Sequence, residues 1–98
     1  MKDLDNVKDI LAEYSEELQQ RYEVAQIGIF GSYARGDQKR RSDVDILVEF
    51  GQGYKTFDNY MELKFSLEEV LHLKVDSVLR NAIRKEIKEH ILPEAIYV

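Results

Sequence analysis

The sequence predicts an α+β fold in which helices pack on a small sheet. Apolar residues recur at intervals of three and four around residues 4–22, 56–71 and 81–91, which is the pattern of helices that bury one face. Three short apolar runs of strand length lie between them, so the expected order is helix, strand, strand, helix, strand, helix. With 98 residues, 44% of them hydrophobic, residues 1–98 are expected to form a single domain around one core.

The N-terminal half is expected to hold one helix and two strands. The helix is predicted over residues 4–22, and its apolar row consists of Leu4, Val7, Leu11, Tyr14, Leu18 and Tyr22. The apolar runs at 24–30 and 43–50 are predicted to be strands. Gly51 and Gly53 then interrupt the pattern.

The C-terminal half is expected to hold two helices around a third strand. Thr56 is predicted to cap a helix that runs to about Leu71. The inner edge of this helix is predicted to consist of Phe57, Tyr60, Met61, Lys64 and Leu67. A strand is expected at 73–79 and a helix at about 81–91, with Pro93 ending the helix and residues 95–98 forming a short closing strand.

The connection between the first two strands carries the most informative residues. The first strand ends in Gly31-Ser32, and after ten further residues Asp43 and Asp45 lead into the second strand. Side chains two apart in a strand point the same way, about 6.5 Å from each other, so both carboxylates are expected on one face. Unpaired carboxylates beside buried positions are costly, and divalent cations are the expected partners.

These residue types at this spacing favour metal-assisted nucleotidyl transfer. Mg²⁺ usually binds through one or two carboxylates together with phosphate oxygens, and two such ions can hold both oxygens of an in-line displacement at phosphorus. Gly31 lets backbone approach a phosphate, and a helix starting near Ser32 would offer free N–H groups and a hydroxyl to it. Either feature alone is common in ordinary turns, and only their combination predicts a triphosphate site.

The segment GSYARGDQKRRSDVDILVEF resembles the DNA polymerase β-like nucleotidyltransferases. It is most similar to their minimal branch (MNT), the MntA-type antitoxins of HEPN/MNT toxin–antitoxin systems, and the likeness runs from about Tyr22 to the end of the chain. This resemblance implies a polymerase β-like fold, with helices packed on a small mixed sheet. The family has a third carboxylate on a later strand, and LKVDSVL offers Asp76 for that role. By resemblance the catalytic and metal-binding residues are Asp43, Asp45 and Asp76, and the nucleotide-binding residues are Gly31, Ser32, Arg35 and Ser42.

The resemblance also implies a reaction and a partner. It implies Mg²⁺-dependent transfer of AMP from ATP to a tyrosine hydroxyl of a cognate HEPN-family ribonuclease toxin, with two ions at the site, so that the toxin is neutralised. Larger nucleotidyltransferases carry an additional domain for the acceptor, and 98 residues leave no room for one, so another molecule must bring the acceptor. The residues themselves identify neither the acceptor nor ATP over another nucleoside triphosphate, and they leave the oligomeric state and the stoichiometry with the toxin open.

Two other functions remain open at this stage. The first is a non-catalytic antitoxin that occludes its toxin, against which the set of three aspartates argues. The second is a nucleotidyltransferase acting on a small molecule or on RNA. The net charge of −5 argues against RNA, because nucleic-acid binding generally needs a basic footprint. The absence of an acceptor domain argues against a small molecule.

Composition and charge indicate where the protein is located and which residues could contact a ligand or partner. Cysteine is absent, no apolar window is long enough to cross a membrane, and the N-terminus does not resemble a signal peptide, so the cytoplasm is the expected location. Basic residues gather locally at Lys39, Arg40 and Arg41, which could be solvated or contact either the nucleotide or an acidic partner surface. Arg35, closer to the glycine turn, is the better candidate for a phosphate contact.

Overall fold

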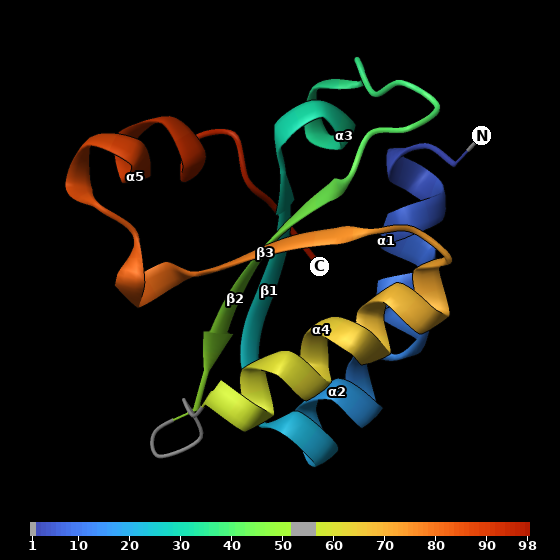
Figure 1. Ribbon diagram of the computed structural model, residues 1–98, viewed down its shortest axis with the longest axis vertical. Helices are drawn as coiled ribbons and strands as arrows, with labels where there is room; N and C mark the ends of the chain where they lie inside the picture. Colours follow the sequence, from blue (N-terminus) through green and yellow to red (C-terminus); the bar gives the residue numbers. More distant parts are fainter. Residues whose placement is uncertain (1, 52–56) are drawn as a thin grey trace.

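A computed structural model describes residues 2–51 and 57–98 (Figure 1). Their elements follow the predicted order, but a short helix lies between the first two strands, and the last helix begins at Lys85, after a 3-10 turn, rather than at about residue 81. The helices are α1 (Leu4–Glu13), α2 (Ser15–Tyr22), α3 (Gly31–Arg35), α4 (Phe57–Leu71) and α5 (Lys85–Ile91), and a short 3-10 turn covers Arg80–Ala82. The strands are β1 (Val24–Phe30), β2 (Val44–Phe50), β3 (Val75–Leu79) and β4 (Ile96–Tyr97). All four predicted strands are therefore confirmed to within two residues. The predicted break at Gly53 and helix cap at Thr56 lie outside the described residues.

The four strands form one mixed sheet in the order β3-β2-β1-β4. β1 runs antiparallel to both β2 and β4, whereas β2 and β3 are parallel. A parallel pair needs a crossover connection, and α4 lies in that connection between β2 and β3. The predicted α+β class with a small mixed sheet is confirmed.

The core lies between one face of the sheet and α1, α2 and α4, which gather on the same side in Figure 1. Alternate residues of β1 and β2 point into it, as expected for strands with one buried face. The buried apolar residues of this cluster are Val7, Leu11, Leu18, Tyr22, Val24, Ile27, Ile29, Tyr33, Val44, Ile46, Val48, Leu63, Leu67, Leu71 and Val75. The opposite face carries Asp45 and Asp76, and α5 lies away from the helical layer.

The prediction of one continuous helix over residues 4–22 was wrong, because the helix breaks at Tyr14. This residue ends α1 and begins α2, with φ −96° and ψ 5°. The Ser15 hydroxyl donates a hydrogen bond to the Ala12 carbonyl at 2.9 Å, and such a bond to the preceding turn bends a helix. The apolar row survives the break, since Leu11 and Leu18 are both buried.

The predicted inner edge of α4 was wrong at Phe57, which is 78% exposed. The buried row is Leu63, Leu67 and Leu71, at spacings of four, and Tyr60 is partly buried. Phe57 is the first residue of α4 and lies beyond the core that this row covers. α4 has 15 residues, and none of the described helices combines the length and apolarity needed to cross a membrane.

Candidate active site

Three segments that are distant in the sequence meet at one end of the sheet. Phe30, the last residue of β1, pairs with Asp45 in β2, and Asp45 lies in register beside Asp76 in β3. Gly31 follows Phe30 directly, so the glycine turn lies at the same end. The structure thus brings together Gly31, Asp45 and Asp76. Asp43 is exposed one residue before β2 begins, close enough for its charge to act on Asp45.

Among these residues, Asp45 has the most strongly perturbed carboxyl group. Burial is the largest cause that raises its pKa, from 3.8 to about 6, followed by the negative charges of Asp76 and Asp43. A hydrogen bond with the Asp76 side chain acts in the same direction, and the Arg35 guanidinium opposes the shift. Because like charges this close together disfavour one another, the group has an excess of negative charge that a cation would relieve.

Position 31 needs a glycine for two reasons: the backbone conformation of the turn and the closeness of the Asp45 carboxylate. Its φ of +73° lies in the left-handed region, which side chains other than glycine adopt only with strain. A Cβ atom at this position would overlap Oδ2 of Asp45. The backbone of the turn therefore lies directly against the central carboxylate, which places the phosphate-binding and metal-binding groups predicted from the sequence in one small region.

The short helix α3 presents Ser32 next to this region. Tyr33, which is only 1% exposed, anchors α3 in the core, and Gly36 ends it with φ +79°. The Asp37 N–H donates to the Ser32 carbonyl at 3.0 Å and closes the turn. Ser32 is itself partly buried in the first turn of α3, where the sequence predicted a phosphate-binding hydroxyl.

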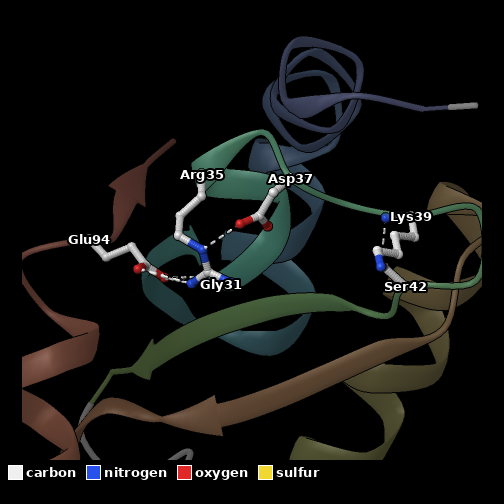
Figure 2. Close-up of polar contacts among 6 residues, drawn as sticks. All are labelled: Gly31, Arg35, Asp37, Lys39, Ser42 and Glu94. Carbon is white, nitrogen blue, oxygen red and sulfur yellow. Dashed lines mark hydrogen bonds and ion pairs between the residues drawn. The ribbon is translucent and has the colours of Figure 1, made fainter.

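Glu94, from the C-terminal segment, contacts the glycine turn directly (Figure 2). The Gly31 N–H donates to Glu94 Oε1 at 2.5 Å. The guanidinium of Arg35 bridges two carboxylates, with Nη1 at 3.1 Å from both Glu94 oxygens and Nε at 3.1 Å from Asp37 Oδ2. These two carboxylates also raise the pKa of Arg35. Arg35 thus lies close to the turn, as predicted, but it is paired with two acids.

Sequence reasoning missed Glu94. It is 63 residues from Gly31 and follows the last helix in the segment PEAIYV, where no spacing links it to the turn. The only available signal was the short closing strand: once this strand pairs with β1, an acid just before it must lie near the end of β1.

The predicted residue Ser42 and the basic residues before Asp43 lie in the loop between α3 and β2. The Ser42 hydroxyl accepts a hydrogen bond from the Lys39 N–H at 2.7 Å, so it stabilises a turn within the loop (Figure 2). Its contact with nucleotide stays a prediction. Arg40 and Arg41 are exposed and, with Asp43, line an open hollow. His72, Leu73 and Lys74 also line it.

The carboxylate pair of Asp45 and Asp76 meets the needs of a divalent cation. Among residues 2–51 and 57–98, no three histidine or acidic side chains converge as a ready metal-ligand group. Asp45 and Asp76 nevertheless form a pair of hard oxygen donors in register on adjacent strands, and their repulsion raises the pKa of Asp45. This donor set fits Mg²⁺, which commonly takes only one or two carboxylates and completes its shell with phosphate oxygens and water.

Residues 11–98 match the family model described as "Nucleotidyltransferase domain". The chain belongs to this family and is a nucleotidyltransferase. It is 43% identical over 100 residues to MJ1379 of Methanocaldococcus jannaschii, which is provisionally named a protein adenylyltransferase, and the match covers all of both chains. It is also 40% identical to the protein adenylyltransferase MntA of Thermococcus cleftensis, over the whole of this chain and 98% of that protein.

Solved structures show the same fold. A structure provisionally assigned to a minimal nucleotidyltransferase superposes with a TM-score of 0.81 and 34% identity, covering 97% of this chain and 95% of the other. A toxin–antitoxin structure with AMP-PNP superposes with a TM-score of 0.71 over 87% of this chain and 69% of that chain, and its 24% identity shows the fold alone. The predicted resemblance to minimal nucleotidyltransferases and MntA is confirmed.

Proposed function

We propose that this nucleotidyltransferase is an antitoxin that transfers AMP from ATP to a tyrosine hydroxyl of a cognate HEPN-family ribonuclease toxin, and thereby neutralises it in the cytoplasm. The observation that carries the transferase chemistry is the register of Asp45 beside Asp76, with the Asp45 carboxylate against the backbone of Gly31. The relatives named protein adenylyltransferase support a protein acceptor. The fold shared with a toxin–antitoxin structure that contains AMP-PNP is the reason for proposing a toxin as that protein and an adenine nucleotide as the donor.

In this proposal one part of the site binds the phosphates of ATP and the other part binds the metal. The turn of Gly31 and Ser32, with Arg35 nearby, contacts the phosphates of ATP through N–H groups, a hydroxyl and a guanidinium. Asp45 and Asp76, with Asp43 at the entrance, would hold Mg²⁺, two ions in the two-metal arrangement. The metal supplies positive charge where negative charge develops on the transferring phosphoryl group.

The reaction forms one bond and breaks one. The acceptor oxygen attacks the α-phosphorus of ATP, and the bond from that phosphorus to the bridging oxygen of pyrophosphate breaks, so pyrophosphate leaves with the electron pair. The hydroxyl proton passes to a carboxylate of the site. Asp76 is the more accessible acceptor, because it is exposed on β3, the edge strand of the sheet, whereas Asp45 is half-buried. The chain itself positions the reactants and needs no enzymic nucleophile.

The test is transfer of labelled AMP to the toxin. The purified chain is incubated with α-labelled ATP, Mg²⁺ and the protein encoded beside it, as the candidate toxin, and that protein is analysed by mass spectrometry for bound AMP and its position. The wild type is expected to label one tyrosine. The variant in which Asp43 and Asp45 are both changed to asparagine is expected to label none, and Asp58→Asn, an exposed change in α4, serves as the matched control.

The outcomes separate this proposal from its alternatives. Neutralisation of the toxin by the double variant at ordinary expression would show that the protein acts by occlusion. Labelling of RNA or of a small molecule in place of the toxin would show a different acceptor. Labelling of the toxin on a residue other than tyrosine would correct the acceptor group while retaining protein adenylylation.

A further inference from the structure

Glu94, which the predicted site did not include, makes one close contact with the glycine turn and two with Arg35. Its carboxylate accepts the Gly31 N–H at 2.5 Å and binds Arg35 Nη1 through both oxygens at 3.1 Å. Its side chain is 27% exposed, compared with 50% for that of Arg35. Hydrogen bonds from a cation and a backbone N–H to a carboxylate are among the stronger polar contacts in proteins.

The position of Glu94 follows from strand pairing. Ile96 in β4 pairs with Ile29 in β1 in an antiparallel register, so the residue two before Ile96 lies opposite the residue two after Ile29. These residues are Glu94 and Gly31. The backbone bonds of β4 and its flanks, including Val98 N–H to the Ile27 carbonyl at 3.0 Å, hold this segment independently of the Glu94 charge.

We propose that Glu94 is a positioning residue for the nucleotide site, a role that rests on the proposed function of the Gly31–Ser32 turn and Arg35. It fixes the Gly31 amide and gives the long Arg35 side chain one orientation. A free arginine side chain has many rotamers, and ordering it only when nucleotide binds would reduce affinity. Arg35 is close enough to Asp45 to oppose the rise in its pKa, so the orientation of Arg35 also affects the carboxylate pair.

Two other roles for Glu94 make different predictions. If Glu94 only held the C-terminal segment against the rest of the protein, its loss would lower the stability of the fold without a specific effect on nucleotide binding. If its carboxylate occupied the place of a phosphate, its neutralisation would tighten nucleotide binding. Positioning predicts weaker binding with little loss of stability, because the backbone contacts of β4 remain.

The experiment compares Glu94→Gln with Glu49→Gln. Glutamine keeps an oxygen for the Gly31 N–H but loses the charge that binds Arg35. Glu49 is a matched control, since it forms an ion pair of similar exposure with Arg80 at 2.9 Å, remote in register from the turn. The measurements are the affinity for ATP with Mg²⁺ by calorimetry, the amide proton shift of Gly31 by NMR, and the melting temperature.

Glu94→Gln is expected to weaken ATP binding by about tenfold, in the range found for residues that orient direct ligands. It is also expected to move the Gly31 amide proton upfield, with a change in melting temperature no larger than that of Glu49→Gln. In an Arg35→Ala background, Glu94→Gln is expected to have no further effect on affinity. Unchanged or tighter binding, or additive effects in that background, would overturn the proposal.

The test does not depend on the toxin. A wild type that binds ATP but fails to modify any toxin would overturn the proposed acceptor and leave the role of Glu94 intact. Conversely, toxin modification by Glu94→Gln with wild-type affinity for ATP would overturn positioning and leave the proposed function intact.

Discussion

Asp45 links the chemistry of the site to the stability of the fold. Its folded-state pKa of about 6 is higher than the ordinary 3.8, so folding favours the protonated carboxyl. The stability contributed by this group is complete below about pH 4 and is lost as the pH rises through about 6. At neutral pH the metal-free protein therefore contains a carboxylate that destabilises it, which is the state that a divalent cation would relieve.

Asp45→Asn is expected to stabilise the metal-free protein at pH 7 while abolishing nucleotidyl transfer. Because the carboxyl is only half-buried, solvent screening limits the gain to about 1 kcal/mol. The gain should vanish at pH 4, where wild-type Asp45 keeps its proton. Chemical denaturation of both proteins at the two pH values, in the presence of a chelator, measures the difference. Mg²⁺ should stabilise the wild type more than the variant, and Asp58→Asn should show neither effect.

Gly31 and Gly36 form a matched pair at the residue scale, because both have positive φ but only one touches the site. A Cβ at Gly31 overlaps Asp45 Oδ2, whereas a Cβ at Gly36 meets nothing within 4 Å. Gly36→Ala is expected to cost about 1 kcal/mol of stability through backbone strain and to leave ATP binding intact. Gly31→Ala should cost more and eliminate ATP binding, because it displaces the central carboxylate.

Denaturation midpoints and ATP titrations of the two glycine variants check this prediction, with Ser32→Ala for comparison. Loss of the Ser32 hydroxyl removes one donor among several and should weaken binding only partly. Equal losses of binding in Gly31→Ala and Gly36→Ala would mean that backbone conformation, rather than contact with Asp45, explains the need for glycine.

The residues of the candidate site differ in how far the sequence could predict them. Gly31, Ser32, Asp43 and Asp45 lie within one connection, and their spacing alone indicated a shared site. The structure gives Gly31 a positive φ and places it against a carboxylate of the neighbouring strand, which only strand register shows. Its approach to a phosphate stays a prediction. Glu94 could not be predicted, because its contact depends on tertiary pairing across 63 residues.

At the scale of elements, the N-terminal cap of α1 gives a direct test of local stabilisation. Asp3 Oδ1 accepts the Asn6 N–H at 2.9 Å, and Asn6 Oδ1 accepts the Asp3 N–H at 3.2 Å, which forms a reciprocal capping box. Asp3→Ala is expected to lower the free energy of unfolding by about 1 kcal/mol. Asp5→Ala, in the exposed first turn, should cost less; equal losses would assign the effect to charge at the helix end rather than to the cap.

Element boundaries were predictable where hydrophobic runs decided them. The strands at 24–30 and 43–50 are rich in apolar residues, and their ends are correct to one residue. The break at Tyr14 was not predictable from periodicity, because Leu11 and Leu18 continue the apolar row across it. The bond from the Ser15 hydroxyl to Ala12 is a local polar contact, to which hydrophobic spacing is insensitive.

At the scale of the whole molecule, charge is distributed unevenly around the site. The net charge is −5, yet the exposed Arg40 and Arg41 line the hollow together with Asp43 and Lys74. In the proposed function the acceptor arrives on a separate protein and must approach a negatively charged group. A local basic surface raises the rate at which an acidic partner segment reaches such a site, and this effect weakens with salt.

Reversal of Lys39, Arg40 and Arg41 to glutamate is therefore expected to slow modification of the toxin and to make its rate less sensitive to salt. The matched control reverses Arg84, Lys85 and Lys88 around α5, which changes the net charge equally but away from the hollow. Initial rates of AMP transfer across a series of salt concentrations distinguish the two, because a pure net-charge effect would be the same in both variants.

A loop variant with the wild-type rate and salt dependence would show that these residues are only solvated and that the acceptor approaches from another side of the sheet. ATP affinity, measured on the same samples, separates a loss of partner approach from a loss of nucleotide contact: steering of the partner predicts that affinity for ATP stays unchanged.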